Sequence, residues 1–178
     1  DMLSQAEHGS GWEQAVLVTT EGDLIESVRA ELERQREFLS RRECVDRVLA
    51  DGVFLMQVES RDDAAALASR YAAEHLEIIT RRAGTLAKKV TAAGAVFLGP
   101  WTPEPVGDFV AGPSHVLPTG GAGRYFSGLT VDKFFRRMSV VNYQKQALRE
   151  EADAIAAFAE AEGLDAHGRS ARIRLEDL

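Results

Sequence analysis

The feature that most constrains the fold is an alternation of short apolar runs with longer amphipathic stretches. Runs rich in β-branched and aliphatic residues occur at residues 15–20, 52–58 and 95–99, and each predicts a buried strand. The stretches between them are long enough for helices. Because strands that alternate with helices form parallel sheets with helices packed on them, we predict an α/β fold built on a helix-covered sheet.

Helical periodicity and capping residues predict where the helices lie. Residues 1–8 are expected to be the end of a helix, which the following Gly-Ser-Gly cluster terminates. Asp23 is expected to cap the next helix. The further predicted helices span residues 23–39, 62–75, 81–91 and 142–162. A short apolar run at 76–79 separates two of them.

The amino-acid composition changes after the third predicted strand. All five prolines fall within residues 100–128, together with several glycines, which predicts a long ordered loop of the kind that often carries function. Residues 134–141 fit either a strand or a helix start, and the tail at 166–178 fits a short linker with a possible strand at 171–175. We therefore expect an α/β part over residues 1–128 and a helical tail over 129–178.

Charge and hydropathy exclude several classes of partner. The 178 residues carry 21 Lys and Arg against 28 Asp and Glu, a net charge of −7, which disfavours nucleic acid as a partner. The apolar runs fall far short of the roughly 18 residues that a membrane helix needs, and no signal sequence is recognised. We expect a soluble, cytoplasmic protein. The single cysteine, Cys44, is interpreted as structural or incidental rather than as a nucleophile.

The four histidines are few, and three of them lie within three residues of an acid or an amide. Gln5 and His8 are three residues apart, so a helix would place both on one face. Glu74 and His75 form an adjacent carboxylate and imidazole, a pair suited to general acid–base work. The plainer alternatives are a solvated helix end for the first pair and a common dipeptide for the second.

Two further groups lie later in the chain. Asp108 and His115 flank a Gly-Pro turn that could present an oxygen and a nitrogen ligand rigidly, or could be a capping acid and a surface histidine. Glu162 and His167 follow the last long predicted helix, where they could merely end it. Histidine, carboxylate and amide ligands together favour a mononuclear Zn²⁺ or Mn²⁺ site. No dinucleotide or P-loop phosphate motif is present.

Six separated segments, in this order, resemble histidinol dehydrogenase. They run over essentially the whole chain and include all four histidines. The segments are Leu-Ser-Gln-Ala-Glu-His at 3–8, Tyr-Ala-Ala-Glu-His-Leu-Glu-Ile at 71–78, Ala-Val-Phe-Leu-Gly-Pro at 95–100, Gly-Asp-Phe-Val-Ala-Gly-Pro-Ser-His-Val-Leu-Pro-Thr at 107–119, Ser-Gly-Leu at 127–129 and Ala-Glu-Gly-Leu-Asp-Ala-His at 161–167. The resemblance implies an aldehyde-dehydrogenase-like α/β fold, here incomplete, with a small helical C-terminal extension.

The resemblance also implies an activity and a site. It implies zinc-dependent, NAD-linked oxidation of L-histidinol through the aldehyde to L-histidine, in histidine biosynthesis. It assigns the general base to His75 and the activation of water to Glu74. The implied zinc ligands are Gln5, His8, Asp108 and His167. The implied substrate contacts are Gln5, His8, His75, Asp108, His115, Glu162 and His167.

The family is also homodimeric, with His167 reaching the metal of the partner subunit, so residues 129–178 are expected to form a dimerisation segment. Family members are more than twice this length, so the chain is expected to match their C-terminal portion and to lack the half that binds NAD. Ala73 stands where a proline usually precedes the Glu-His pair. We therefore expect zinc ligands but no competent NAD site in this chain alone.

Two other interpretations stay open. A paralogous enzyme could oxidise another polar alcohol such as a sulfonated diol, although Glu162 would repel an anionic substrate. The chain could also be a non-catalytic module for zinc binding or dimerisation.

Overall fold

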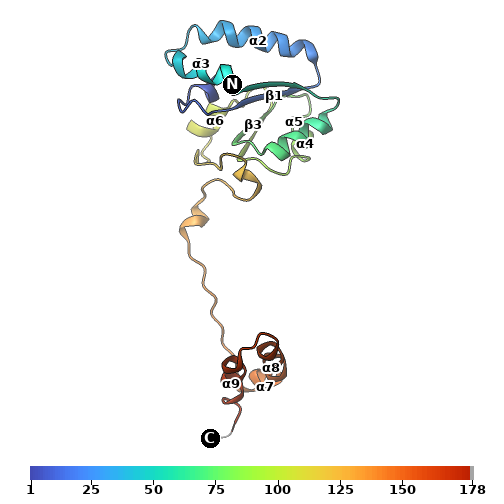
Figure 1. The fold of residues 1–178 in the computed structure, drawn as a ribbon, viewed down its shortest axis with the longest axis vertical. Helices are drawn as coiled ribbons and strands as arrows, with labels where there is room; N and C mark the ends of the chain where they lie inside the picture. Colours follow the sequence, from blue (N-terminus) through green and yellow to red (C-terminus); the bar gives the residue numbers. More distant parts are fainter. Residues whose placement is uncertain (177–178) are drawn as a thin grey trace. The chain divides into compact units, whose positions relative to one another are not determined.

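The computed structural model describes residues 1–176 and divides the chain into two compact units (Figure 1). The first unit is Asp1–Phe134 and the second begins at Phe135, a few residues beyond the expected boundary at 128. The last two residues of the predicted tail, 177 and 178, lie outside the described residues. Among the described helices, none has the length and apolar character needed to cross a bilayer.

Parallel strand pairs form the centre of the first unit. β1 (Ala15–Thr19) pairs with β2 (Val53–Gln57), and β3 (His75–Ile78) pairs with β4 (Ala95–Leu98). The α/β prediction is therefore confirmed, with the strands arranged as two small parallel sheets. The predicted strands at 15–20, 52–58 and 95–99 correspond to β1, β2 and β4.

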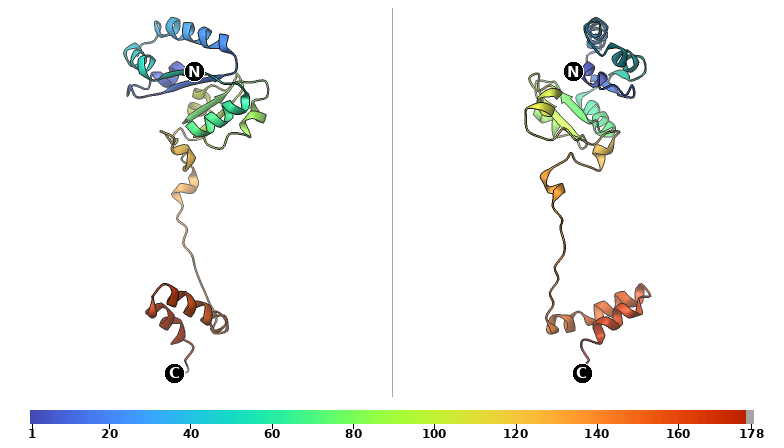
Figure 2. Two further views of the ribbon diagram at one scale, coloured as in Figure 1. Left: turned by 45° about the vertical axis from the view of Figure 1, so that its right-hand side comes forward. Right: turned by 90° about the vertical axis from the view of Figure 1, so that its left-hand side faces the viewer.

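Helices connect the parallel strands, as parallel pairing requires. The helices α2 (Gly22–Arg36) and α3 (Arg42–Asp51) link β1 to β2, and α2 packs against both strands (Figure 2). The chain then passes through α4 (Arg61–Tyr71) to β3 and through α5 (Ala83–Ala87) to β4.

An apolar core ties the first helix to this framework. The helix α1 (Met2–Ala6) packs against α3. Val45 and Val48 on α3 are completely buried, and the other members of the cluster are Leu3, Ala6 and Leu32. The helix that precedes His8 is thus anchored by hydrophobic burial, the main favourable contribution to folding.

Several predicted helices are too long. The first long helix ends at Arg36 instead of 39, and Asp23 lies in its first turn, where it makes no side-chain cap. The helix expected to reach His75 ends at Tyr71, because Ala72 adopts a left-handed conformation with φ 53°. His75 therefore begins a strand. The basic helix predicted at 81–91 is confined to Ala83–Ala87.

The proline-rich segment is not a loop throughout. It contains the helix α6 (Glu104–Phe109), so Asp108 lies on a helix and not in a loop as predicted. Pro105 lies in the first turn of α6, where a missing N–H breaks no helical hydrogen bond. Short 3₁₀ turns follow at Ala122–Arg124 and Val131–Phe134.

The second unit consists of short helices: α7 (Lys145–Glu150), α8 (Ala152–Ala161) and α9 (Asp165–Arg172). The predicted helix at 142–162 is therefore split at Glu151, and the predicted strand at 171–175 is wrong. Gly168 and Ala171 are buried at helical spacing, and α9 packs on α8. In residues 134–141, expected as a strand or helix start, Phe134 ends a short 3₁₀ turn, and residues 135–141 form neither a strand nor a helix.

Candidate active site

The backbone places Glu74 and His75 at the amino end of the β3–β4 pair. The carbonyl oxygens of Ala73 and Glu74 accept hydrogen bonds from the amides of Gly94 and Ala95, both at 2.8 Å. A Cβ at Gly94 would lie 2.5 Å from the Glu74 carbonyl oxygen, so this close approach requires glycine. The Glu-His pair is therefore fixed by the backbone that precedes β4.

The His75 side chain is buried with its ring nitrogens unpaired. It is 8% exposed, its Nε2 atom lies 3.5 Å from Oδ1 of Asp108, and its ring centroid lies 6.0 Å from that of Phe97. Among the described residues, neither ring nitrogen has a hydrogen-bond partner. Because buried polar atoms are nearly always paired, this imidazole is suited to binding a metal or exchanging a proton with a ligand.

The helix α6 brings two carboxylates to His75. Glu104 and Asp108 are four residues apart and so lie on one face of α6. Oε1 of Glu77 on β3 accepts a hydrogen bond of 2.9 Å from the Glu104 amide. A Cβ at Gly107 would clash with the Phe97 ring, so glycine allows α6 to approach β4. These contacts fix α6 against the strand that carries His75.

Among the residues that the structure describes, Glu104 is the one buried charged residue, at 8% exposed. Burial raises the pKa of Glu104, and its hydrogen bond with Asp108 and the Asp108 charge raise it further. The His75 charge acts in the opposite direction on that pKa without reversing the shift. The sequence analysis missed Glu104. Its four-residue spacing from Asp108 becomes a signal only once α6 is recognised as a helix.

These three side chains form a potential metal site. One ligand atom from each of His75, Glu104 and Asp108 can be chosen so that all lie within 4.8 Å of one another. An imidazole nitrogen and carboxylate oxygens suit Zn²⁺ and Mn²⁺. The residues present therefore fit a metal ion.

The structure holds Gln5 and His8 at the end of α1. His8 is exposed, and its Nδ1 lies 3.1 Å from the carbonyl oxygens of both Ser4 and Gln5. Arg41 donates a hydrogen bond of 3.2 Å to the His8 carbonyl oxygen. The Ser4 hydroxyl on the same helix donates a hydrogen bond of 2.6 Å to the Asp1 carbonyl oxygen, and neither Gln5 nor His8 is a member of the group of three.

The loop after His8 is closed by a carboxylate. Glu13 accepts hydrogen bonds from the amides of Ser10 at 2.7 Å and Gly11 at 2.8 Å. Its partial burial acts to raise the pKa, but the hydrogen bonds from Ser10 and Gly11 outweigh burial and lower the pKa of Glu13 to about 2.

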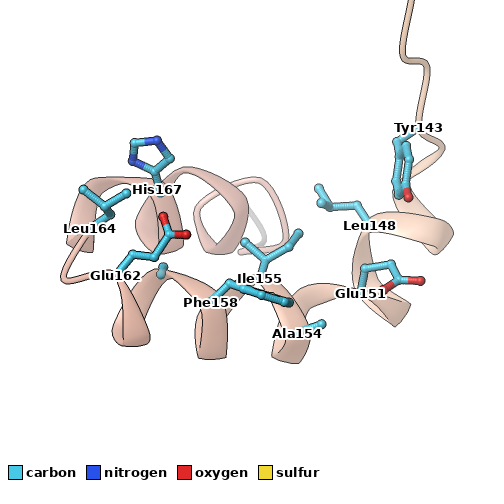
Figure 3. Close-up of a pocket in the computed structure, with 10 residues that line it drawn as sticks. Tyr143, Leu148, Glu151, Ala154, Ile155, Phe158, Glu162, Leu164 and His167 are labelled. Atoms are coloured by element: carbon cyan, nitrogen blue, oxygen red, sulfur yellow. The ribbon is translucent and has the colours of Figure 1, made fainter. Parts of the chain in front are cut away.

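The remaining predicted residues are exposed. His115 lies in the irregular segment after α6. Glu162 and His167 lie in the second unit, where they line one end of a groove of about 550 Å³ (Figure 3). Apolar side chains such as Ile155, Phe158 and Leu164 form most of that groove. The structure thus brings His75 and Asp108 together and presents Glu162 and His167 at an open surface.

Comparison with known proteins identifies the family. The family model for histidinol dehydrogenase matches residues 1–175. The histidinol dehydrogenase of Heliobacterium mobile is 47% identical over 176 residues, which are 99% of this chain and 41% of the relative. That of Nitratidesulfovibrio vulgaris is 48% identical over 174 residues, 98% of this chain and 40% of the relative.

A solved structure agrees with these matches. The crystal structure of histidinol dehydrogenase from Elizabethkingia anophelis matches with a TM-score of 0.87 at 32% identity, covering 98% of this chain and 40% of that one. The chain therefore spans about 40% of the length of the relatives that it matches. From its motifs, the full-length family match and this structural likeness, we conclude that the chain belongs to the histidinol dehydrogenase family.

Proposed function

We propose that this chain supplies the metal-binding and acid–base residues of a zinc-dependent, NAD-linked enzyme that oxidises L-histidinol through L-histidinaldehyde to L-histidine. The observation that carries the proposal is the buried His75, 3.5 Å from Asp108, in a chain of the histidinol dehydrogenase family. Because the chain spans about 40% of its relatives, we assign the activity to the intact protein and place the NAD-binding residues outside these 178 residues.

We assign the zinc ligands to Gln5, His8, Asp108 and His167. In a homodimer, His167 of the partner subunit would complete the set, which fits its exposure in this chain. Asp108 lies in the cluster with His75 and Glu104, and Gln5 and His8 are assigned from the family motif at the end of α1. When bound, zinc would supply a Lewis acid that orients the amino alcohol, and NAD would supply the hydride acceptor.

The chain's own residues would then carry the proton transfers. His75, with an unpaired ring nitrogen, would take the proton of the substrate hydroxyl in the first oxidation. Glu74, adjacent to it at the edge of β3, would take a proton from the water that attacks the aldehyde. His115 and Glu162 would line the substrate site, where the Glu162 carboxylate suits an imidazole-bearing, cationic substrate.

The proposal also covers the fold class, the dimerisation segment, the cellular location and the partners. We place the first unit in the aldehyde-dehydrogenase-like class, as the C-terminal part of a catalytic domain, and we assign dimerisation to residues 129–178. The working location is the cytoplasm, where histidine is made. We expect neither nucleic acid nor a membrane as a partner, in line with the net charge of −7.

Zinc affinity tests the metal site directly. In the intact protein, we expect alanine at Gln5, His8, Asp108 or His167 to weaken zinc binding by about 100-fold each, a quarter of a typical zinc binding energy. Competition with a chelator would measure this. The matched control is Asp62→Ala, which removes an exposed acid that pairs with Lys89 away from the cluster. Unchanged affinity in all four variants would overturn the assignment.

Turnover tests the substrate. We expect NADH formation from L-histidinol by the intact protein and none by the isolated 178-residue chain, although the isolated chain should still bind zinc. Faster oxidation of a sulfonated diol would favour the paralogous enzyme instead. Zinc binding without oxidation of either alcohol by the intact protein would favour the non-catalytic module.

A further inference from the structure

One face of the β3–β4 pair carries the candidate site. His75 and Glu77 lie two residues apart on β3, so their side chains leave the same face of the strand. Phe97 is the register partner of Glu77 on β4, and its ring centroid lies 6.0 Å from that of His75. A Cβ at Gly107 would clash with this ring, so α6 packs on the same face. Glu77 therefore lies between His75 and the start of the helix that carries Asp108.

The amino end of α6 obtains a hydrogen-bond acceptor from Glu77. The first amides of a helix have no partner within it, and a side chain of the N-cap residue often accepts one of their hydrogen bonds. The N-cap residue of α6 is Pro103, which has no side-chain oxygen. Oε1 of Glu77, 27 residues away along the chain, accepts the hydrogen bond of 2.9 Å from the Glu104 amide instead. Glu77 thus fixes the point on β3 at which α6 begins.

A second hydrogen bond fixes the chain just before α6. Oγ1 of Thr102 donates a hydrogen bond of 2.9 Å to the carbonyl oxygen of Leu98 at the end of β4. The start of α6 is therefore held on both strands, by Thr102 on β4 and by Glu77 on β3. Asp108 lies about one helical turn after Glu104, so the place at which α6 begins determines where the Asp108 carboxylate points.

We propose that Glu77 is a positioning residue, which holds the Asp108 carboxylate at His75 by accepting the hydrogen bond that begins α6. This inference rests on the proposed function, because it takes Asp108 as a zinc ligand. Groups that hold a metal ligand in its orientation typically contribute about 10–100-fold to metal affinity. Glu77 acts on Asp108 through one turn of helix, so we expect an effect of about tenfold, at the lower end of that range.

Two substitutions at Glu77 separate its hydrogen bond from its charge and its volume. Glu77→Gln keeps the length of the side chain and a carbonyl oxygen that can accept from the Glu104 amide, whereas Glu77→Leu fills a similar volume without an acceptor. We expect Glu77→Leu to weaken zinc binding about tenfold and Glu77→Gln to stay within about twofold of wild type. Chelator competition in the intact protein measures both affinities. In Co²⁺-loaded samples, the visible spectrum should change for the Leu variant and be preserved for the Gln variant.

A third substitution keeps the charge and moves the acceptor. Glu77→Asp withdraws the carboxylate oxygens by one methylene, so it should bind zinc about as weakly as Glu77→Leu, and it supplies the measurement if the Leu variant does not fold. A Gln variant as weak as the Leu variant would overturn the inference, because the charge and not the hydrogen bond would then matter. Wild-type affinity in the Asp and Leu variants would overturn it as well.

A variant on the other face of β3 controls for general destabilisation. Ile78 is buried, and its side chain leaves β3 on the face opposite to Glu77. Ile78→Val removes one methylene from that side and should lower the melting temperature without changing the zinc affinity or the Co²⁺ spectrum. Equal losses of zinc affinity in Ile78→Val and Glu77→Leu would mean that destabilisation of the strand explains both, and the inference would be wrong.

Failure of the inference differs from failure of the proposed function. Asp108→Asn should weaken zinc binding in the same assay whatever the role of Glu77. Unchanged affinity in Asp108→Asn would reject the metal assignment itself. Weaker binding in Asp108→Asn, together with wild-type binding in Glu77→Leu, would reject only the positioning role.

Discussion

The two units of the chain differ in how they present their proposed site residues. In the first unit, His75 and Asp108 are 8% and 14% exposed, and hydrogen bonds and close glycine contacts fix the backbone around them. In the second unit, Glu162 and His167 are exposed at the end of an open groove. The first unit therefore holds its proposed site residues through contacts within the unit, whereas the second unit presents them at its surface.

The largest expected effect is on catalysis, and it compares substitutions of the two histidines, one in each unit. In the intact protein, His75→Asn should lower kcat for histidinol oxidation by about 10²–10⁴-fold, because it removes the proposed general base. The zinc content of this variant should stay at the wild-type level. His167→Asn should instead lower zinc affinity, with activity restored in part at high zinc concentration.

Steady-state kinetics and metal analysis of the two variants provide the measurement. A His75→Asn enzyme with nearly wild-type kcat would contradict the acid–base role of the buried imidazole. Equal zinc loss in both variants would contradict the assignment of proton transfer to His75 and of zinc binding to His167.

The second prediction tests whether the units are stable independently. Val48 is completely buried in the first unit, so Val48→Ala should cost that unit about 1–3 kcal/mol through lost burial and a cavity. In the second unit, a Cβ at Gly168 would lie 3.2 Å from the Ala159 Cβ. Gly168→Leu should therefore force α8 and α9 apart and cost about 1–3 kcal/mol through overpacking.

Hydrogen exchange measured segment by segment provides the readout for both variants. Val48→Ala should speed exchange in residues 1–134 only, and Gly168→Leu should speed it in the second unit only. Accelerated exchange in both units from either single substitution would show that they unfold together.

Sequence patterns predicted the parts of the fold that are locally determined. The strands β1, β2 and β4 follow from apolar runs that are too short for most helices and are rich in β-branched and aromatic residues. The end of α4 could not be predicted in this way, because the left-handed residue there is Ala72 and not glycine. The helix α6 was missed because Pro105 and Gly107 lie within it, although Pro105 occupies the one turn that tolerates proline.

The candidate site was predictable only in part. Motif resemblance pointed to His75 and Asp108, but their approach to 3.5 Å depends on contacts between distant segments, such as Gly107 with Phe97. Glu104 has no local sequence signal as a buried acid, because its burial arises when α6 packs against β3 and β4. Residue spacing describes one helix or strand at a time, whereas the surroundings of this site are formed by three elements.

The smallest predicted effect is on the stability of the first unit. It tests whether the Glu13 carboxylate holds the loop after His8 in place. The hydrogen bonds that lower the pKa of Glu13 to about 2 stabilise the folded state only while this carboxylate is charged. Since its unfolded value is 4.5, the stabilisation is complete above about pH 4.5 and is lost as the pH falls toward 2. Glu13→Gln should therefore destabilise the first unit by roughly 1 kcal/mol near neutral pH, after allowance for solvent screening.

Thermal unfolding of wild type and Glu13→Gln at about pH 7 and about pH 3 measures the difference. The gap between the two proteins should shrink at the lower pH, because wild type loses the interaction that the variant already lacks. The control is Glu26→Gln, which removes an exposed acid 3.9 Å from Arg29 on the surface of α2, where ion pairs contribute little. A gap that stays constant with pH would mean that Glu13 stabilises the loop by packing and not through its charge. The rigidity of the His8 loop would then not depend on an ionised carboxylate.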